Sequence, residues 1–349
     1  MELQAPSAPS AYKWLEDEKE IQGATAAGYT VPADKEIGKY TYKRYSKQQG
    51  CDWMVANAYT VEVMACGSIT VEDPIGKKGA FTDPRDNKVY KTVKMPDGKV
   101  WFAENLNYQV GLTWNQPFNQ AKEEEYISTT TGEKAIGSFW CPAVSGATLS
   151  ADKNTCNVYG ALYTWETAMS EDGKGEWTES DLTTEYASQV VASDPTANLK
   201  IAKGGGNRGI CPEGWRIPTV LEWATIMDKI EGDGLGDNYT GQVPGGKYGI
   251  DVISKLAVKE TYTGTDKGIG GWYTGTPTIA STGFDLQPAG SRSSVAGIFS
   301  GRGTNVTLLS QQWSKPRNVI VIDGSLQANT TRFLGTWRAT AASVRCIQN

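Results

Sequence analysis

The sequence predicts an α+β chain in which a small all-β module precedes a larger domain that combines helices and strands. Two observations support this fold class. From Tyr12 onward, short aromatic and β-branched runs alternate with turn residues, which is typical of antiparallel strands. Further along, Thr219 and Glu222 form a T-x-x-E capping box, so we expect a helix to begin near Val220.

The helix that follows the capping box is predicted to be amphipathic. Trp223, Ile226, Met227 and Ile230 recur at helical spacing and therefore share one apolar face. Gly232 then supplies a left-handed stop. We expect the apolar face to pack against the rest of the domain.

The N-terminal module is predicted to contain antiparallel strands at 12–15, 29–31, 40–44 and 59–63. Trp14, followed by the tyrosine-rich run that ends in Tyr42, resembles the core tryptophan and tyrosine corner of an immunoglobulin-like sandwich. Because the strand with Trp14 begins at Tyr12, the first strands of such a sandwich are missing. We therefore expect a partial immunoglobulin-like module, either truncated or completed by another segment or chain.

The charge balance argues against nucleic acid and anionic membranes as partners. The chain has 349 residues, with 39 acidic and 34 basic side chains and a net charge of -5. No stretch is long and apolar enough to predict a membrane span, and the N-terminus lacks the regions of a signal peptide. If the protein is exported, we expect its signal to lie upstream of Met1 or to have been removed.

The sequence contains no histidine, and this excludes many catalytic mechanisms. Ser-His-Asp and Cys-His catalysis, histidine-bound zinc and facial-triad iron all require that side chain. Enzymes of these classes are therefore ruled out.

Five segments, in order along the chain, carry a family resemblance. They are Val89–Tyr108 (VYKTVKMPDGKVWFAENLNY), Tyr159–Met169 (YGALYTWETAM), Cys211–Thr219 (CPEGWRIPT), Gly283–Gly290 and Ser343–Cys346 (SVRC). Together they resemble the Fibrobacter succinogenes major paralogous domain, over about residues 79–349. Through the RIPT element and the Glu-Trp pair that follows it, the resemblance extends more distantly to the formylglycine-generating enzyme group, whose fold is related to C-type lectins.

The resemblance implies a fold and a division of the chain. It implies an α+β, C-type-lectin-like domain with a hairpin turned at Pro96-Asp97-Gly98, a helix over 159–169, and long surface loops at 171–209 and 231–270. The expected divisions are a flexible lead at 1–11, the partial immunoglobulin-like module at 12–66, a linker at 67–78 and the family domain at 79–349.

Six cysteines allow fifteen disulfide pairings. The family pattern, together with proximity along the chain, favours Cys211 with Cys346 and Cys141 with Cys156, which leaves Cys51 with Cys66. Such oxidation implies a bacterial protein at the cell surface or outside the cell. The alternative is six free thiols in a cytosolic protein.

No cofactor is expected. Asp228, Asp233 and Asp237 are hard oxygen ligands that suit structural calcium, but no further pattern supports a site there. The formylglycine-generating relatives use a cysteine pair to bind copper and oxidise a substrate. Because the final hundred residues contain only Cys346, an oxidase of that type is a less favoured reading, and we expect no enzymatic activity.

The resemblance implies a binding face near the C-terminus, because some members of this family are varied by diversity-generating retroelements. The C-terminal region of this chain keeps the framework motifs of the family. The positions between these motifs hold residues other than the Tyr and Asn that are usual in the family. The predicted binding residues are Ser291, Ser293, Ile298, Leu308, Leu309, Trp313, Val319, Val321, Thr336, Trp337 and Arg338. We expect them to cluster on one exposed surface.

This pattern predicts a secreted or cell-surface adhesion protein that binds a protein or glycan, with the N-terminal module joining it to a pilus or anchor. The alternative is a structural fimbrial or surface-layer component without a specific ligand. Ordinary drift of strands and loops would also explain the varied positions.

Overall fold

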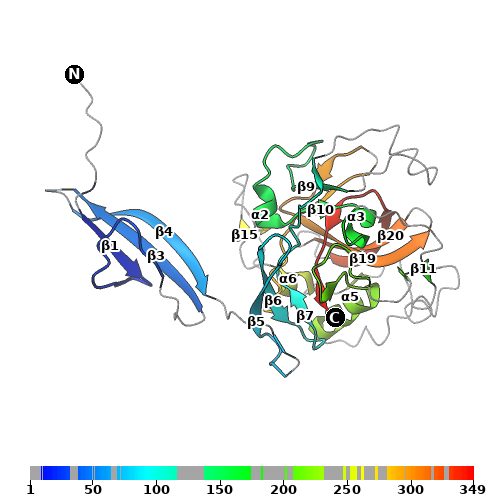
Figure 1. Cartoon of the computed structure of the whole chain (residues 1–349), viewed down its shortest axis with the longest axis horizontal. Coiled ribbons are helices and arrows are strands. Elements are labelled where there is room, and N and C mark those ends of the chain that lie inside the picture. The colour runs from blue at the N-terminus through cyan, green and yellow to red at the C-terminus, as the bar shows by residue number, and fades with distance from the viewer. Residues whose placement is uncertain are drawn as a thin grey trace, which may run out of the picture. The chain divides into compact units, whose positions relative to one another are not determined.

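The chain divides into two units, Met1–Gly67 and Ser68–Asn349 (Figure 1). The computed structural model describes residues 9, 11–31, 38–48, 50, 52–63, 69–70, 72–115, 137–173, 182–183, 201–202, 207–231, 247–248, 252–257, 261–262, 272–273, 281–294, 296–315, 318–325 and 330–349.

The first unit contains one antiparallel sheet in the order β2-β1-β3-β4. Its strands are β1 (Ala11–Glu16), β2 (Lys19–Glu20), β3 (Gly38–Lys47) and β4 (Met54–Val63). Residues 29–31 are not a strand. They belong to a segment that covers Trp14, whose indole donates to the carbonyl of Ala26 at 3.0 Å and lies 5.8 Å from the ring of Tyr29. The described residues of this unit form a single four-stranded sheet, and this sheet is what the structure shows in place of the predicted partial immunoglobulin-like module.

The second unit is built around two sheets. The smaller has the order β13-β23-β7-β6-β5, with β5 (Lys78–Thr82), β6 (Val89–Lys94), β7 (Val100–Phe102), β13 (Trp215–Arg216) and β23 (Ile347–Gln348). The larger has the order β14-β21-β20-β19-β22-β10-β9-β8. Its strands are β8 (Thr113–Trp114), β9 (Ser138–Trp140), β10 (Leu162–Tyr163), β14 (Lys247–Tyr248), β19 (Asn305–Lys315), β20 (Asn318–Ser325), β21 (Thr330–Trp337) and β22 (Ala342–Ser343).

Three further pairs of short strands complete the sheets of the described residues. They are β11 (Leu182–Thr183) with β12 (Ile201–Ala202), β15 (Thr261–Tyr262) with β16 (Trp272–Tyr273), and β17 (Ser291–Arg292) with β18 (Phe299–Ser300). The helices within the described ranges are α2 (Thr155–Tyr159), α3 (Trp165–Met169), α5 (Val220–Glu231) and α6 (Val252–Leu256).

Both faces of the large sheet are buried at its centre. Leu308 on β19 and Ile322 on β20 belong to a core that includes α5 and α6. The adjacent residues Leu309 and Val321 belong to a second core that includes Trp165 of α3. The central strands of this sheet are therefore covered on one face by a core that includes α5 and α6 and on the other by a core that includes α3 and residues of the small sheet.

The predicted C-type-lectin-like α+β domain is a wrong assignment, because the described structure is mostly β-sheet with a small number of short helices. The helix expected over 159–169 shows one reason. Gly160 has φ +75°, and a Cβ there would lie 2.4 Å from the Cβ of Asn105. The close approach ends α2, and the chain continues as β10 before α3 begins.

The predicted hairpin and the predicted helix start are confirmed. Strands β6 and β7 pair antiparallel on either side of the turn at Pro96-Asp97-Gly98. At the start of α5, the amide of Glu222 donates to the hydroxyl of Thr219 at 3.2 Å. The carboxylate of Glu222 accepts from the amide of Thr219 at 3.0 Å, which completes the capping box.

Two of the three expected disulfides are present, Cys141–Cys156 and Cys211–Cys346. Cys51 and Cys66 lie outside the described residues, as do most of the loops expected at 171–209 and 231–270. The second disulfide joins the segment before α5 to the segment before β23, so it closes the core on which the helix packs.

The largely buried carboxylate of Glu222 also forms ion pairs with two basic side chains, the partly buried Arg216 and the exposed Lys99. Arg216 donates to its two oxygens at 2.6 and 2.5 Å, and the ammonium of Lys99 lies 2.5 Å from one of them. Burial alone would raise the pKa of Glu222, but the bonds from Arg216 and Lys99 outweigh it and lower the pKa from 4.5 to about 2.

This pKa predicts an acid dependence of stability. Because the folded pKa lies below the unfolded one, the cluster stabilises the fold above pH 4.5 and loses this contribution as pH falls toward 2, by about 3 kcal/mol in total. We expect the stability gap between wild type and Glu222→Gln, measured by urea unfolding, to shrink over that range. Glu213→Gln, at an exposed position, is the control. A gap that stays constant from pH 6 to 2 would contradict the prediction.

If α5 is docked on the core, Trp223→Ala should destabilise the fold more than Thr219→Ala. The ring of Trp223 is fully buried, 4.8 Å from the ring of Trp101 and 5.9 Å from that of Phe284. Trp223→Ala should destabilise the fold by about 3 to 5 kcal/mol. Thr219→Ala removes only the capping hydroxyl and should cost about 1 kcal/mol. Chemical denaturation measures both, and equal small effects would show that α5 is not docked.

Candidate functional site

The structure does not bring the predicted binding residues to one exposed surface. Ile298 and Trp337 are exposed, and Ser291, Ser293 and Thr336 are partly exposed. The buried members are Leu308, Leu309, Val319, Val321 and Arg338. The side chain of Trp313 lies outside the described residues.

The physical reason lies in the large sheet. Alternation along a strand exposes every second side chain only where one face of the sheet meets solvent. Because β19 and β20 are covered on both faces, Leu308 packs into one core, and Leu309, Val319 and Val321 pack into the other. These four residues are packing residues.

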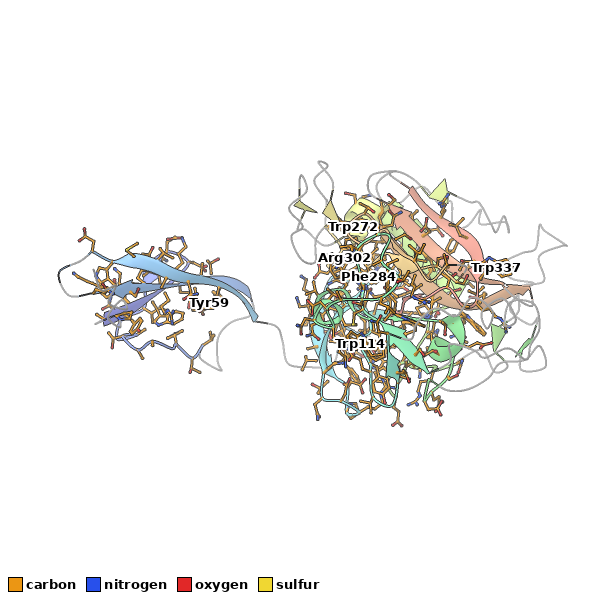
Figure 2. All side chains as sticks on the ribbon, turned by 90° about the horizontal axis from the view of Figure 1, so that it is seen from above. Tyr59, Trp114, Trp272, Phe284, Arg302 and Trp337 are labelled. Carbon is orange, nitrogen blue, oxygen red and sulfur yellow. A yellow bond between two sulfur atoms is a disulfide. The ribbon has the colours of Figure 1, made fainter. Side chains whose placement is uncertain are left out.

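The remaining predicted residues with described side chains lie on two neighbouring segments, one that runs from Ser291 in β17 to Ile298 just before β18 and one at the end of β21. The amide of Ser293 donates to the carbonyl of Ile298 at 2.9 Å. A chain of hydroxyls then joins the segments, from Thr336 to Thr340 at 3.2 Å and from Thr340 to Ser294 at 3.3 Å. We call Ser293, Ile298, Thr336 and Trp337 the Trp337 surface; Figure 2 labels Trp337 itself.

A buried ion pair supports this surface from beneath. Arg338, next to Trp337, lies 2.9 Å from the carboxylate of Glu166, and both side chains are almost fully buried. Glu166 is in the first turn of α3, and the amide of Trp165 donates to the carbonyl of Arg338 at 3.0 Å. The sequence placed Arg338 on the surface and gave no sign of Glu166, because the two residues are far apart along the chain.

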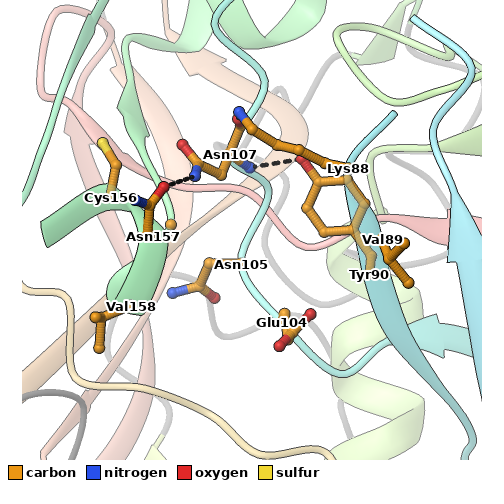
Figure 3. Close-up of a pocket in the computed structure, with 10 residues that line it drawn as sticks. Lys88, Val89, Tyr90, Glu104, Asn105, Asn107, Cys156, Asn157 and Val158 are labelled. Atoms are coloured by element: carbon orange, nitrogen blue, oxygen red, sulfur yellow. Dashed lines mark hydrogen bonds between the residues drawn. The ribbon is translucent and has the colours of Figure 1, made fainter. Parts of the chain in front are cut away.

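A polar cavity of about 200 Å³ lies elsewhere in the second unit, between the β6 strand, the segment after β7 and helix α2 (Figure 3). Its lining residues are Lys88, Val89, Tyr90, Glu104, Asn105, Asn107, Cys156, Asn157, Val158 and Gly160. Sequence reasoning missed this cavity. Within the family motif, the polar residues of Glu104-Asn105-Leu106-Asn107 follow the apolar run that ends at Ala103, and they are the signal in the sequence that could have indicated it.

A second cavity, of about 420 Å³, is lined in part by Lys94, Lys229 and Lys255. Lys255 donates to the carbonyl of Ile230 at 3.1 Å, near the end of α5. A cation suits the negative end of a helix, so this lysine has a structural explanation.

Neither a metal site nor a membrane helix is found in the described part of the chain. No group of three or more Cys, Asp or Glu there is placed to hold an ion. Of the three aspartates considered for calcium, only Asp228 is described. No described helix is long and apolar enough to cross a membrane.

The family model described as the Fibrobacter succinogenes major domain matches residues 95–348. The chain belongs to this family. No curated protein and no solved structure matches the chain. The predicted family is thus confirmed, and the two disulfides of this family member indicate a non-cytoplasmic protein.

The buried ion pair between Arg338 and Glu166 predicts that removing one charge destabilises the fold and that removing both restores most of the stability. Glu166→Leu leaves the guanidinium of Arg338 buried without its carboxylate and should destabilise the fold by about 3 to 5 kcal/mol. The double variant Glu166→Leu with Arg338→Met removes both charges and should recover most of that loss. Thermal unfolding of the three proteins tests this. A double variant no more stable than the single one would show that Arg338 is not balanced by Glu166.

Proposed function

We propose that this Fibrobacter succinogenes major domain protein is a secreted or cell-surface adhesion protein that binds a protein or glycan through the Trp337 surface. The observation that carries the proposal is the exposure of Trp337 and Ile298, 37% and 38%, on adjoining segments of a disulfide-bonded unit. Large apolar side chains exposed together mark interaction sites, and Trp is a frequent energetic anchor.

The support beneath the surface favours binding with little rearrangement. Trp337 precedes Arg338, which is fixed by its ion pair to Glu166. The hydroxyl chain through Thr340 fixes the neighbouring segment. A surface held in one conformation loses less entropy when a partner binds, and affinity rises accordingly.

A structural role in a fimbria or surface layer is the second candidate, and the N-terminal sheet favours it. In the described residues this sheet ends on one side at the ten-residue strand β4, which exposes Met54, Val55 and Tyr59. A long edge strand is a template for pairing with another chain. Under this alternative, light scattering would show a mass that rises with protein concentration.

The adhesion proposal predicts a specific loss of retention. Beads coated with the whole chain are washed over immobilised mucin, as the glycan arm, or immobilised fibronectin, as the protein arm. Trp337→Ala should weaken retention on one of them by about 30-fold, the effect of a hot spot of about 2 kcal/mol. The melting temperature should change by no more than about 2 °C, because the side chain is partly solvated.

Ile75→Ala is the matched control, since it also removes an exposed apolar side chain, in the segment before β5. It should leave retention unchanged. If beads coated with Trp337→Ala are retained as well as wild-type beads, the Trp337 surface is not the binding site. If wild-type beads are retained on neither mucin nor fibronectin, and the mass of the protein rises with its concentration, the assembly role is favoured.

A further inference from the structure

The cavity in Figure 3, which is partly open to solvent, presents polar atoms from three separate segments to one space. Asn105 and Glu104 come from the segment after β7, Tyr90 from β6, and Asn157 from α2. Val89 and Val158 add apolar surface at the same site. The lining therefore combines a carboxylate, amides and aliphatic groups.

The polar groups of the cavity are held in place by bonds behind them. Asn105 donates to the carbonyl of Tyr159 at 2.8 Å and accepts from the guanidinium of Arg345 at 2.7 Å. The hydroxyl of Tyr90 accepts from the amide of Asn107 at 3.1 Å. The lining is thus preorganised, which reduces the entropic cost of binding.

The wall formed by α2 is fixed as well. The side chain of Asn107 donates to the side-chain oxygen of Asn157 at 3.3 Å. Cys156, the neighbour of Asn157, is bonded to Cys141. The short helix therefore cannot drift away from the opposite wall of the cavity.

Two kinds of hydrogen-bonding capacity remain for a ligand. One carboxylate oxygen of Glu104 accepts from the amide of Lys91 at 2.9 Å, and the other can accept again. Asn157 uses its oxygen toward Asn107 and keeps its NH₂ group as a donor. One ligand hydroxyl can donate to the carboxylate of Glu104, and another can accept from the NH₂ group of Asn157.

The cationic group in the lining of the cavity is already engaged. The ammonium of Lys88 lies 3.4 Å from the carboxylate of Asp86 and donates to the carbonyl of Asn107. The lining therefore does not select for an anionic ligand.

We propose that this cavity binds a neutral polyhydroxylated ligand of the size of one sugar ring. Hydroxyls of the ligand can pair with the acceptor on Glu104 and the donor on Asn157, and its C–H groups can contact Val158 on one side of the cavity and Val89 on the other. Sites for drug-sized ligands measure about 300 to 1,000 Å³. A cavity of about 200 Å³ therefore fits a monosaccharide rather than a longer chain. The site is separate from the Trp337 surface and does not depend on it.

Saturation-transfer NMR with the whole chain tests the proposal. The probes are glucose, galactose, mannose and N-acetylglucosamine, with glucosamine, glucuronate and glycine as charged comparisons. At least one neutral sugar should show saturable transfer. Asn157→Ala should weaken its binding by about tenfold, the ratio expected for the loss of one good hydrogen bond. Glu104→Gln should weaken binding in the same direction, because an amide is a poorer acceptor than a carboxylate.

Asn154→Ala is the control, because Asn154 precedes the same helix, is exposed and makes no side-chain capping bond. It should bind the sugar as the wild type does. The proposal fails if no neutral sugar binds, if only a charged probe binds, or if Asn157→Ala and Asn154→Ala bind equally while both stay folded by circular dichroism. Because free monosaccharides are measured in solution, this result is independent of retention on mucin or fibronectin.

Discussion

The second unit depends on the hydrogen bonds that the buried guanidinium of Arg345 donates. It donates to the carbonyls of Phe102, Phe284 and Asp285 at 3.0, 2.7 and 3.0 Å, and to the side chain of Asn105 at 2.7 Å. Burial lowers its pKa to about 9, so it remains charged at neutral pH. A buried charge that lost these partners would be strongly destabilising, and the three segments are therefore held in one arrangement.

This arrangement places the other features of the unit. Cys346, the next residue, is bonded to Cys211 ahead of α5, and Ile347 pairs with Trp101 on β7. Trp101 in turn packs against Trp223 of α5. Asn105, oriented by Arg345, contributes a wall of the polar cavity. The C-terminal segment thus organises the helix, the small sheet and the cavity at once.

Sequence reasoning succeeded where the signal is local and failed where distant contacts decide. The capping box of Thr219 and Glu222 depends on residues three apart, and the structure forms it as predicted. The break at Gly160 depends on Asn105, which approaches from another segment. The burial of Leu308 and Leu309 depends on helices covering both faces of a sheet, and no pattern within one strand distinguishes this from a half-exposed strand.

The same contacts limit where this fold can vary its surface. A substitution that truncates Leu309, fully buried between β20 and α3, costs about 2 to 5 kcal/mol through lost burial and a cavity. Most domains have only about 5 to 15 kcal/mol of stability, so few such changes are tolerated together. An exposed side chain such as Trp337 can change at little cost, provided that Arg338 and Glu166 are kept. Variation of the surface at low cost in stability is therefore confined to the ends of strands and their turns, while the central strands must keep their packing.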